Sequence, residues 1–249
     1  MRARPSWAPP QVWIWRALVI TVLVLGSGVV ASLNWAPVAP SWRFLLLALG
    51  RSWWLAGVAM GFGGAAAVPL ALVRVYGRRW PRRAASLLIE AVRATPELMI
   101  IFWVYFTLPV VTGSRVSAWN AALASLSVIA AAYLAEVVRA GLYSVPAAQG
   151  EAARALGLRS FAVFRLVVLP QALRNMLPAL IAQLVALFKT TSLVSAIGVL
   201  DFFRAVSVTN NAIYDPYPLY IILGAGYFVS CWTITQVVRC FDPSYQLLD

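Results

Sequence analysis

Histidine is absent from this 249-residue sequence, lysine occurs once, at Lys189, and the only cysteines are Cys231 and Cys240. The commonest general base and most metal ligands are therefore missing. Cys231 lies inside an apolar run, so neither a zinc site nor a disulfide framework is indicated. We expect no catalytic residue, no metal and no cofactor on this chain.

A nucleotide-binding loop of the form GxxxxGK[ST] is excluded as well. Its lysine would have to be Lys189, which follows Phe188 where the loop requires glycine. If ATP drives this protein, a partner polypeptide must bind the nucleotide.

Charged residues are also scarce. They make up 11% of the sequence, against 62% hydrophobic residues, whereas soluble domains carry about 25% charged residues. The sequence therefore predicts an all-α integral membrane protein. Lysine and arginine together number 20 against 8 acidic residues, a surplus that suits either anionic lipid or nucleic acid. Because the arginines lie between apolar runs, we expect a lipid bilayer and no nucleic acid.

Six apolar segments are long enough to cross a bilayer, which takes roughly 20 helical residues. The expected spans cover residues 12–33, 52–75, 84–110, 119–139, 172–190 and 219–238. The stretch from Trp42 to Leu49 is interpreted as a separate interfacial helix, since its tryptophan fits an aromatic belt. We expect a single transmembrane domain over residues 1–249.

The arginines predict the orientation. With a cytoplasmic N-terminus, 15 arginines fall on the inner side and only Arg43, Arg51, Arg115 and Arg204 fall outside. This positive-inside bias predicts cytoplasmic termini at both ends. The first span has an alternative, because Arg2, Arg4 and the apolar run after them also resemble a secretory signal. The run is long for a signal core, which favours a retained span.

The longest inner loop, residues 139–171, predicts two short helices joined at a glycine. Glu151 suits the N-terminal end of the first helix, Gly157 suits its end, and Pro170 is expected to end or kink the second. Ala152 and Ala153 give the first helix a small face. Such a compact knob fits a groove in another protein.

This loop resembles the "EAA" loop of permease subunits in ABC importers. The likeness rests on Glu151-Ala152-Ala153, Gly157, Leu169 and Pro170 with the spacing of that motif. It implies that these residues form the helix that docks into the ATP-binding subunit. It also implies a type I importer core of five helices over residues 44–240, to which residues 1–43 add an N-terminal span and outer loop.

Three further segments are similar to polar amino-acid permeases. They are Arg93-Ala-Thr95-Pro96, Ala132-Tyr133-Leu-Ala-Glu136-Val-Val-Arg139 and Leu187-Phe-Lys189-Thr-Thr191-Ser192-Leu. Asp201-Phe-Phe-Arg204 resembles glutamate and aspartate members in particular. The resemblance implies ABC ATPase subunits, a second permease subunit, an extracytoplasmic binding protein and an amino-acid substrate as partners, in the inner membrane of a bacterium.

The sequence departs from that family at three places. Ala94 replaces a usual glycine, Glu97 replaces an apolar residue, and Thr190 stands where Asp or Asn is frequent. An ionisable group at membrane depth normally faces a cavity or a partner. Thr95, Glu97, Lys189, Thr191 and Ser192 are therefore the candidates for the substrate path. For Lys189 an interfacial anchor is an equally simple interpretation.

Two other acidic residues have arginine partners one helical turn away. Glu136 precedes Arg139, and Glu90 precedes Arg93, so both are expected to form ion pairs within a helix.

An ion-gradient-driven secondary transporter or channel is the alternative function. It accounts for the spans but leaves the knob without a purpose, and the internal repeats of such transporters are not visible. An intramembrane enzyme lacks the residues it would need.

Overall fold

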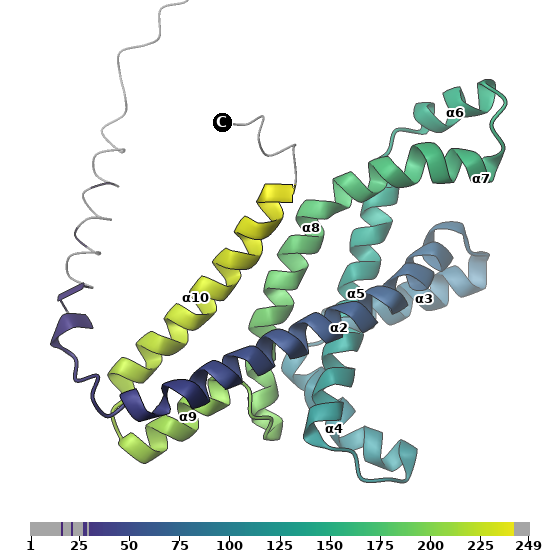
Figure 1. Ribbon diagram of the computed structural model, residues 1–249. Helices are drawn as coiled ribbons and strands as arrows, with labels where there is room; N and C mark the ends of the chain where they lie inside the picture. Colours follow the sequence, from purple (N-terminus) through teal and green to yellow (C-terminus); the bar gives the residue numbers. More distant parts are fainter. Residues whose placement is uncertain (1–15, 17–20, 22–26, 29, 242–249) are drawn as a thin grey trace, which may run out of the picture.

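The computed structural model describes residues 16, 21, 27–28 and 30–241, and each regular element within that part of the chain is a helix (Figure 1). The elements are the 3-10 turn η1 (Ala39–Ser41), α2 (Trp42–Tyr76), α3 (Arg79–Ala94), α4 (Glu97–Thr112), α5 (Ala118–Tyr143), α6 (Ala147–Ala155), α7 (Ser160–Val163), the π-helical turn η2 (Phe164–Val168), α8 (Leu169–Thr190), the 3-10 turn η3 (Thr191–Ile197), α9 (Phe202–Ile213) and α10 (Pro216–Phe241).

Four stretches among the described residues are long and apolar enough to cross a membrane. They are Ala39–Tyr76, Ala118–Tyr143, Ser160–Ile197 and Pro216–Val237. They contain the expected spans 52–75, 119–139 and 172–190 and cover 219–238 to within one residue, so these four predictions are confirmed. The expected first span, residues 12–33, lies largely outside the described residues.

The expected span 84–110 is not one continuous helix. The chain forms two helices there, α3 and α4, which meet at an angle of 109°. Pro96 has no amide hydrogen and disfavours helical backbone at the residue before it. Thr95 accordingly is extended, with φ −91° and ψ 135°. Taken together, α3 and α4 are long and apolar enough to form a fifth span that is broken between them.

The separate interfacial helix expected at Trp42–Leu49 is also wrong, because these residues form the first two turns of α2. No proline separates them from the span that follows. Their inner face is held by tertiary packing, since Leu45 and Ala48 are buried against Phe202 of α9 and Leu219 of α10.

The main core lies between α2 and α5, and small residues make it possible. Ala59, Ala67 and Ala71 of α2 are fully buried, as are Ala122 and Ala130 of α5. At Gly63 a Cβ atom would lie 2.4 Å from the Cβ of Ala130. The two helices therefore approach at backbone distance, the packing that small residues allow in membranes.

The arginine-rich segments gather at one end of the bundle. Figure 1 shows α6, α7 and the C-terminal end of α10 on the same side, toward which the turn between α2 and α3 also points. The connection from α4 to α5 and helix α9 lie at the other end. We refer to these as the arginine-rich end and the opposite end.

Candidate coupling loop and substrate path

The coupling knob consists of α6, Gly157 and α7, at the arginine-rich end. Gly157 has φ +83°, a left-handed conformation that glycine adopts without steric cost. The Leu158 amide donates to the Ala153 carbonyl at 3.2 Å and the Gly157 amide to the Arg154 carbonyl at 2.9 Å. These two bonds form a Schellman motif. The prediction that Gly157 ends the first helix is confirmed.

Two details of that loop differ from expectation. Helix α6 begins directly after Pro146, so Glu151 lies in its middle instead of at its N-terminal end. Pro170 does not end the second helix, since it occupies the first turn of α8 and the helix continues. The turn before it widens to a π-helix, in which the Leu169 amide donates to the Phe164 carbonyl. This wider turn accommodates a residue that lacks an amide hydrogen.

The knob exposes apolar side chains that sequence reasoning missed. Leu156 is 84% exposed and Phe161 72% exposed. Glu151 and Ala152 are exposed beside them, while Ala153 is buried. A large apolar residue on each side of Gly157, in a loop outside the apolar runs, was the signal available in the sequence. Exposed apolar groups of this kind suit contact with a partner protein or with lipid.

The chain segments that flank the knob pack against the helices of the bundle. Asn175 of α8 donates to the hydroxyl of Ser144, at the end of α5, at 2.8 Å. A Cβ atom at Gly141 would lie 2.1 Å from the Met176 side chain, so α5 and α8 touch closely there. Phe164 packs edge-on against Tyr76 at the end of α2. The segments on either side of the knob therefore contact one another, from the end of α5 to the start of α8, and η2 contacts the end of α2.

A charge cluster lies near the same end. Glu136 of α5 accepts hydrogen bonds from Arg139 and, at 2.5 Å, from Arg74 of α2. Arg93 of α3 lies 3.7 Å from the same carboxylate. The expected Glu136–Arg139 pair is confirmed. The expected Glu90–Arg93 pair is wrong, because Glu90 pairs with Arg74 at 3.0 Å. The cluster joins α2, α3 and α5.

The candidate path residue Glu97 meets Thr190, which was not among the candidates, at the break between α3 and α4. The Thr190 hydroxyl donates to Glu97 Oε2 at 2.7 Å. Glu97 is the first residue of α4, where the positive end of the helix dipole favours a carboxylate. Thr190 is buried and Glu97 half-buried. Two of the three positions at which the sequence departs from the family pattern thus contact each other.

The remaining path candidates are divided among several places. Thr95 is the residue that ends α3, and its hydroxyl donates to the Ala91 carbonyl at 2.8 Å. Thr191 is fully buried and donates to the Phe188 carbonyl. Ser192 is half-buried and donates to the Lys189 carbonyl. Lys189 is exposed and borders a groove of about 380 Å³ that Thr235 of α10 also lines. Lys189 therefore does not share the Glu97–Thr190 contact.

Asp201 has a structural role at the start of α9. It is fully buried and its carboxylate accepts from the amides of Phe203 at 3.1 Å and Arg204 at 2.9 Å, which caps α9. Burial raises the pKa of Asp201 to about 6, against the lowering effect of these bonds and of the Arg204 charge. The neighbouring Phe202 amide donates to the buried Ser52 hydroxyl. The residue that suggested glutamate and aspartate members is thus accounted for by local structure.

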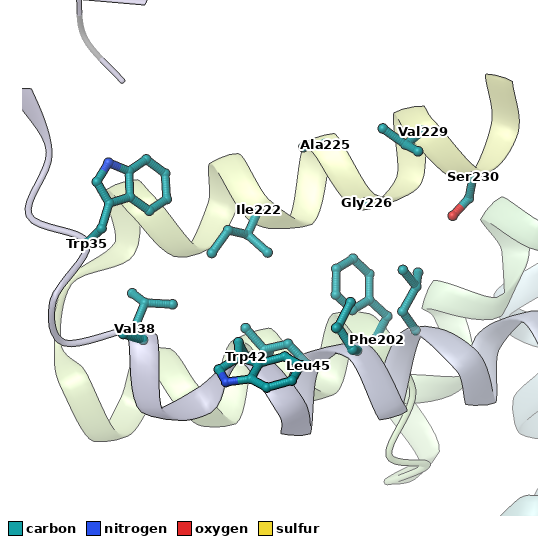
Figure 2. Close-up of a pocket in the computed structure, with 13 residues that line it drawn as sticks. Trp35, Val38, Trp42, Leu45, Phe202, Ile222, Ala225, Gly226, Val229 and Ser230 are labelled. Carbon is teal, nitrogen blue, oxygen red and sulfur yellow. The ribbon is translucent and has the colours of Figure 1, made fainter. Parts of the chain in front are cut away.

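An apolar groove of about 600 Å³ separates the start of α2 from α10 (Figure 2). Trp35, Val38, Leu45 and Phe202 line it. The hydroxyl of Ser230, also in the lining, accepts a hydrogen bond from Trp53 at 3.0 Å. A polar substrate would find few partners here, since its groups would lose water without replacement. The groove is therefore not a candidate substrate site.

A bundle of apolar helices long enough to span a membrane, one pair of them bent, with a helical knob beyond its end is the architecture of a membrane transport subunit. The chain belongs to the family of binding-protein-dependent transport system inner membrane components, whose model matches residues 59–246. This confirms the membrane assignment and the resemblance on which the loop was first interpreted.

Known relatives agree with the family. The chain is 38% identical to the octopine transport system permease protein of Rhizobium meliloti, over 70% of this chain and 74% of that protein. It is 32% identical to the nopaline transport system permease protein of Agrobacterium fabrum, over 78% and 84%. The crystal structure of an amino acid ABC transporter with histidines superposes with a TM-score of 0.79, at 29% identity, over 85% of this chain and 98% of that chain.

Proposed function

We propose that this chain is the translocating permease subunit of an ATP-driven importer for a polar amino acid. The knob carries the proposal, because it is a helical element at the arginine-rich end that exposes the apolar side chains of Leu156 and Phe161. A secondary transporter or channel has no use for such an element. The names of the relatives, among them octopine, nopaline and glutamine permeases, support the substrate class.

The mechanism is alternating access without covalent chemistry. Two ATPase subunits would close on ATP, and each would move a knob seated in its groove. The segments that flank the knob join it to the bundle: the end of α5 packs on α8 at Ser144 and Met176, and Phe164, next to α7, packs on α2. A rigid-body displacement of the ATPase would therefore rock these helices as a unit. A second permease subunit, identical or homologous, would complete the path, and a binding protein outside would deliver the substrate.

The break between α3 and α4 is the proposed polar step in the path. Glu97 and Thr190 place a carboxylate and a hydroxyl beside a helix N-terminus. A carboxylate there would attract the ammonium group of an amino acid, and the free amides of α4 would favour its carboxylate. The names of the relatives do not agree on one substrate, so the proposal stops at polar amino acids, with glutamate and aspartate among them.

Uptake by the reconstituted complex tests the function. The chain is purified with its ATPase subunits, placed in vesicles with ATP inside, and supplied with the binding protein and a labelled amino acid outside. We expect uptake that requires ATP and survives ionophores that abolish ion gradients. Uptake that continues without ATP and stops with the ionophores would support the secondary transporter instead.

A further inference from the structure

The N-terminal turn of α3 carries an unusual concentration of positive charge. Arg78, Arg79, Arg82 and Arg83 lie within six residues, immediately after the end of α2. All four are exposed, and none forms an ion pair in the described part of the chain. The nearest acidic residue on α3, Glu90, is already paired with Arg74.

Three of these arginines line a concave site. Arg79, Arg82 and Arg83 share it with Gly77, Ser86 and Leu87, around a hollow of about 740 Å³. The residues at 79, 82, 83 and 86 recur at helical spacing, so they share one side of α3. Three guanidinium groups and a hydroxyl on one side offer many hydrogen-bond donors and no carboxylate acceptor.

This arrangement destabilises α3 when no anion is present. Arg79 repels Arg82 and Arg83 at spacings of three and four residues, and like charges at these spacings disfavour a helix. The positive end of the helix dipole adds to the repulsion. Arg78, at the cap position, makes no side-chain hydrogen bond to the first amides. An anion bound here would satisfy the amides and neutralise the guanidinium groups at once.

The surroundings indicate an amphiphilic anion. The site lies directly after Tyr76, the last residue of the apolar stretch Ala39–Tyr76, where exposed arginines replace the apolar run. Leu87, itself in the lining, is 69% exposed, and Trp80 is 79% exposed. Tryptophan and arginine at this depth are typical of contact with the headgroup region. A phosphate would meet the arginines while acyl chains cover Leu87 and Trp80.

We propose that Arg79, Arg82, Arg83 and Ser86 form a binding site for the phosphate headgroup of an anionic phospholipid. The lipid holds the turn between α2 and α3 at the membrane surface, next to the Arg74–Glu136 cluster that joins α2, α3 and α5. This site is independent of the proposed transport function.

The test is a titration with dioctanoyl phosphatidylglycerol. The chain is purified in detergent with its partner subunits, and bound lipid is counted by native mass spectrometry. The triple variant Arg79→Gln, Arg82→Gln, Arg83→Gln should weaken binding on the order of 100-fold, roughly fivefold for each arginine. Arg43→Gln, Arg51→Gln, Arg115→Gln removes the same charge at the opposite end and should change binding less than about twofold.

A second variant separates loss of the site from loss of folding. Arg79→Lys, Arg82→Lys, Arg83→Lys keeps the charge and should recover most of the binding, and the glutamine result counts only if that variant keeps its partner subunits in the same mass spectrum. Equal binding by the wild type and the glutamine variant overturns the proposal. Displacement of the lipid by inorganic phosphate at equal concentration overturns the lipid assignment, because the site would then select free phosphate.

Discussion

The position of Lys189 allows two interpretations of its role. It stands in the last turn of α8, exposed, and borders the groove toward α10. One interpretation is that its ammonium reaches the membrane surface as an anchor. The other is that it attracts the carboxylate of the substrate, at a cost of roughly 2.5–3.5 kcal/mol if the charge lies at membrane depth. Its separation from the Glu97–Thr190 contact favours the anchor.

Lys189→Met distinguishes these roles. If the side chain is an anchor, the variant should carry substrate at the normal rate and apparent affinity, because methionine keeps the apolar stem. The measurement is uptake by vesicles containing the complex, normalised to basal ATPase activity, with Lys189→Arg as the control that keeps the charge. Impaired uptake in Lys189→Met alone would place the charge on the substrate path.

Asp201 predicts a pH dependence of stability. Its pKa is about 6 in the folded protein and about 3.9 in an unfolded chain. The folded state therefore holds the proton more tightly, and ionised Asp201 lowers the free energy of unfolding above pH 6. This penalty disappears as the pH falls from about 6 to about 4.

Asp201→Asn should remove this dependence and keep the cap, since asparagine also caps helices well. The melting temperature of the wild type should rise relative to the variant between pH 7 and pH 4.5, by an amount that corresponds to at most about 3 kcal/mol. Thermal unfolding of both proteins at the two pH values measures the difference. Identical pH dependence in the two would show that Asp201 is not buried in its charged form.

At the scale of elements, the sequence predicted what depends on local pattern. Spans 119–139, 172–190 and 219–238 are continuous apolar runs, and each became a helix. The Gly157 stop followed from local backbone chemistry. The break at Thr95–Pro96 was overlooked because the apolar run continues past the proline, although Pro96 marks it. The pairing of Glu90 with Arg74, 16 residues away in the sequence, depends on how α2 meets α3, which no local pattern contains.

The α2–α5 contact can be tested with two glycines of one helix. Gly63→Ala should destabilise the protein by roughly 1–3 kcal/mol, since the new methyl group would meet Ala130 at 2.4 Å and backbone atoms at 3.0 Å. Gly57 has no neighbour within 4 Å, so Gly57→Ala should leave stability unchanged or slightly raised by better helix propensity. Thermal unfolding in detergent compares them. Equal melting temperatures would mean that the helices do not touch at Gly63.

At the scale of the whole molecule, the distribution of arginines between the two ends of the bundle supports one membrane topology. The turn between α2 and α3, with its arginines, points toward the end that carries α6 and α7, while Arg115 and Arg204 belong to the elements at the opposite end. The positive-inside rule then predicts that the arginine-rich end faces the cytoplasm. This orientation also brings the knob to the side on which ATP is available.

Single cysteines test this topology in a chain whose Cys231 and Cys240 are replaced by serine. A cysteine that replaces Arg79 or Arg159 should face the cytoplasm, and a cysteine that replaces Arg115 should face the outside of the cell. The measurement is labelling of intact cells with a thiol reagent that does not cross the membrane, before and after permeabilisation. Outside labelling at position 159 contradicts both the topology and the proposed docking of the knob.

The central claim is that the knob couples this chain to an ATPase, and a matched pair of glycines tests it most directly. Gly157 and Gly113 both have positive φ, +83° and +64°, and a Cβ atom added at either would have no atom of the described chain within 4 Å beyond its immediate neighbours. Leucine at either site therefore meets similar backbone strain, about 1–2 kcal/mol, and open space within the subunit. Co-purification of the ATPase subunits with each variant, at equal amounts in the membrane, is the measurement. We expect Gly157→Leu to lose the ATPase and Gly113→Leu to retain it. Full retention by Gly157→Leu would contradict the account.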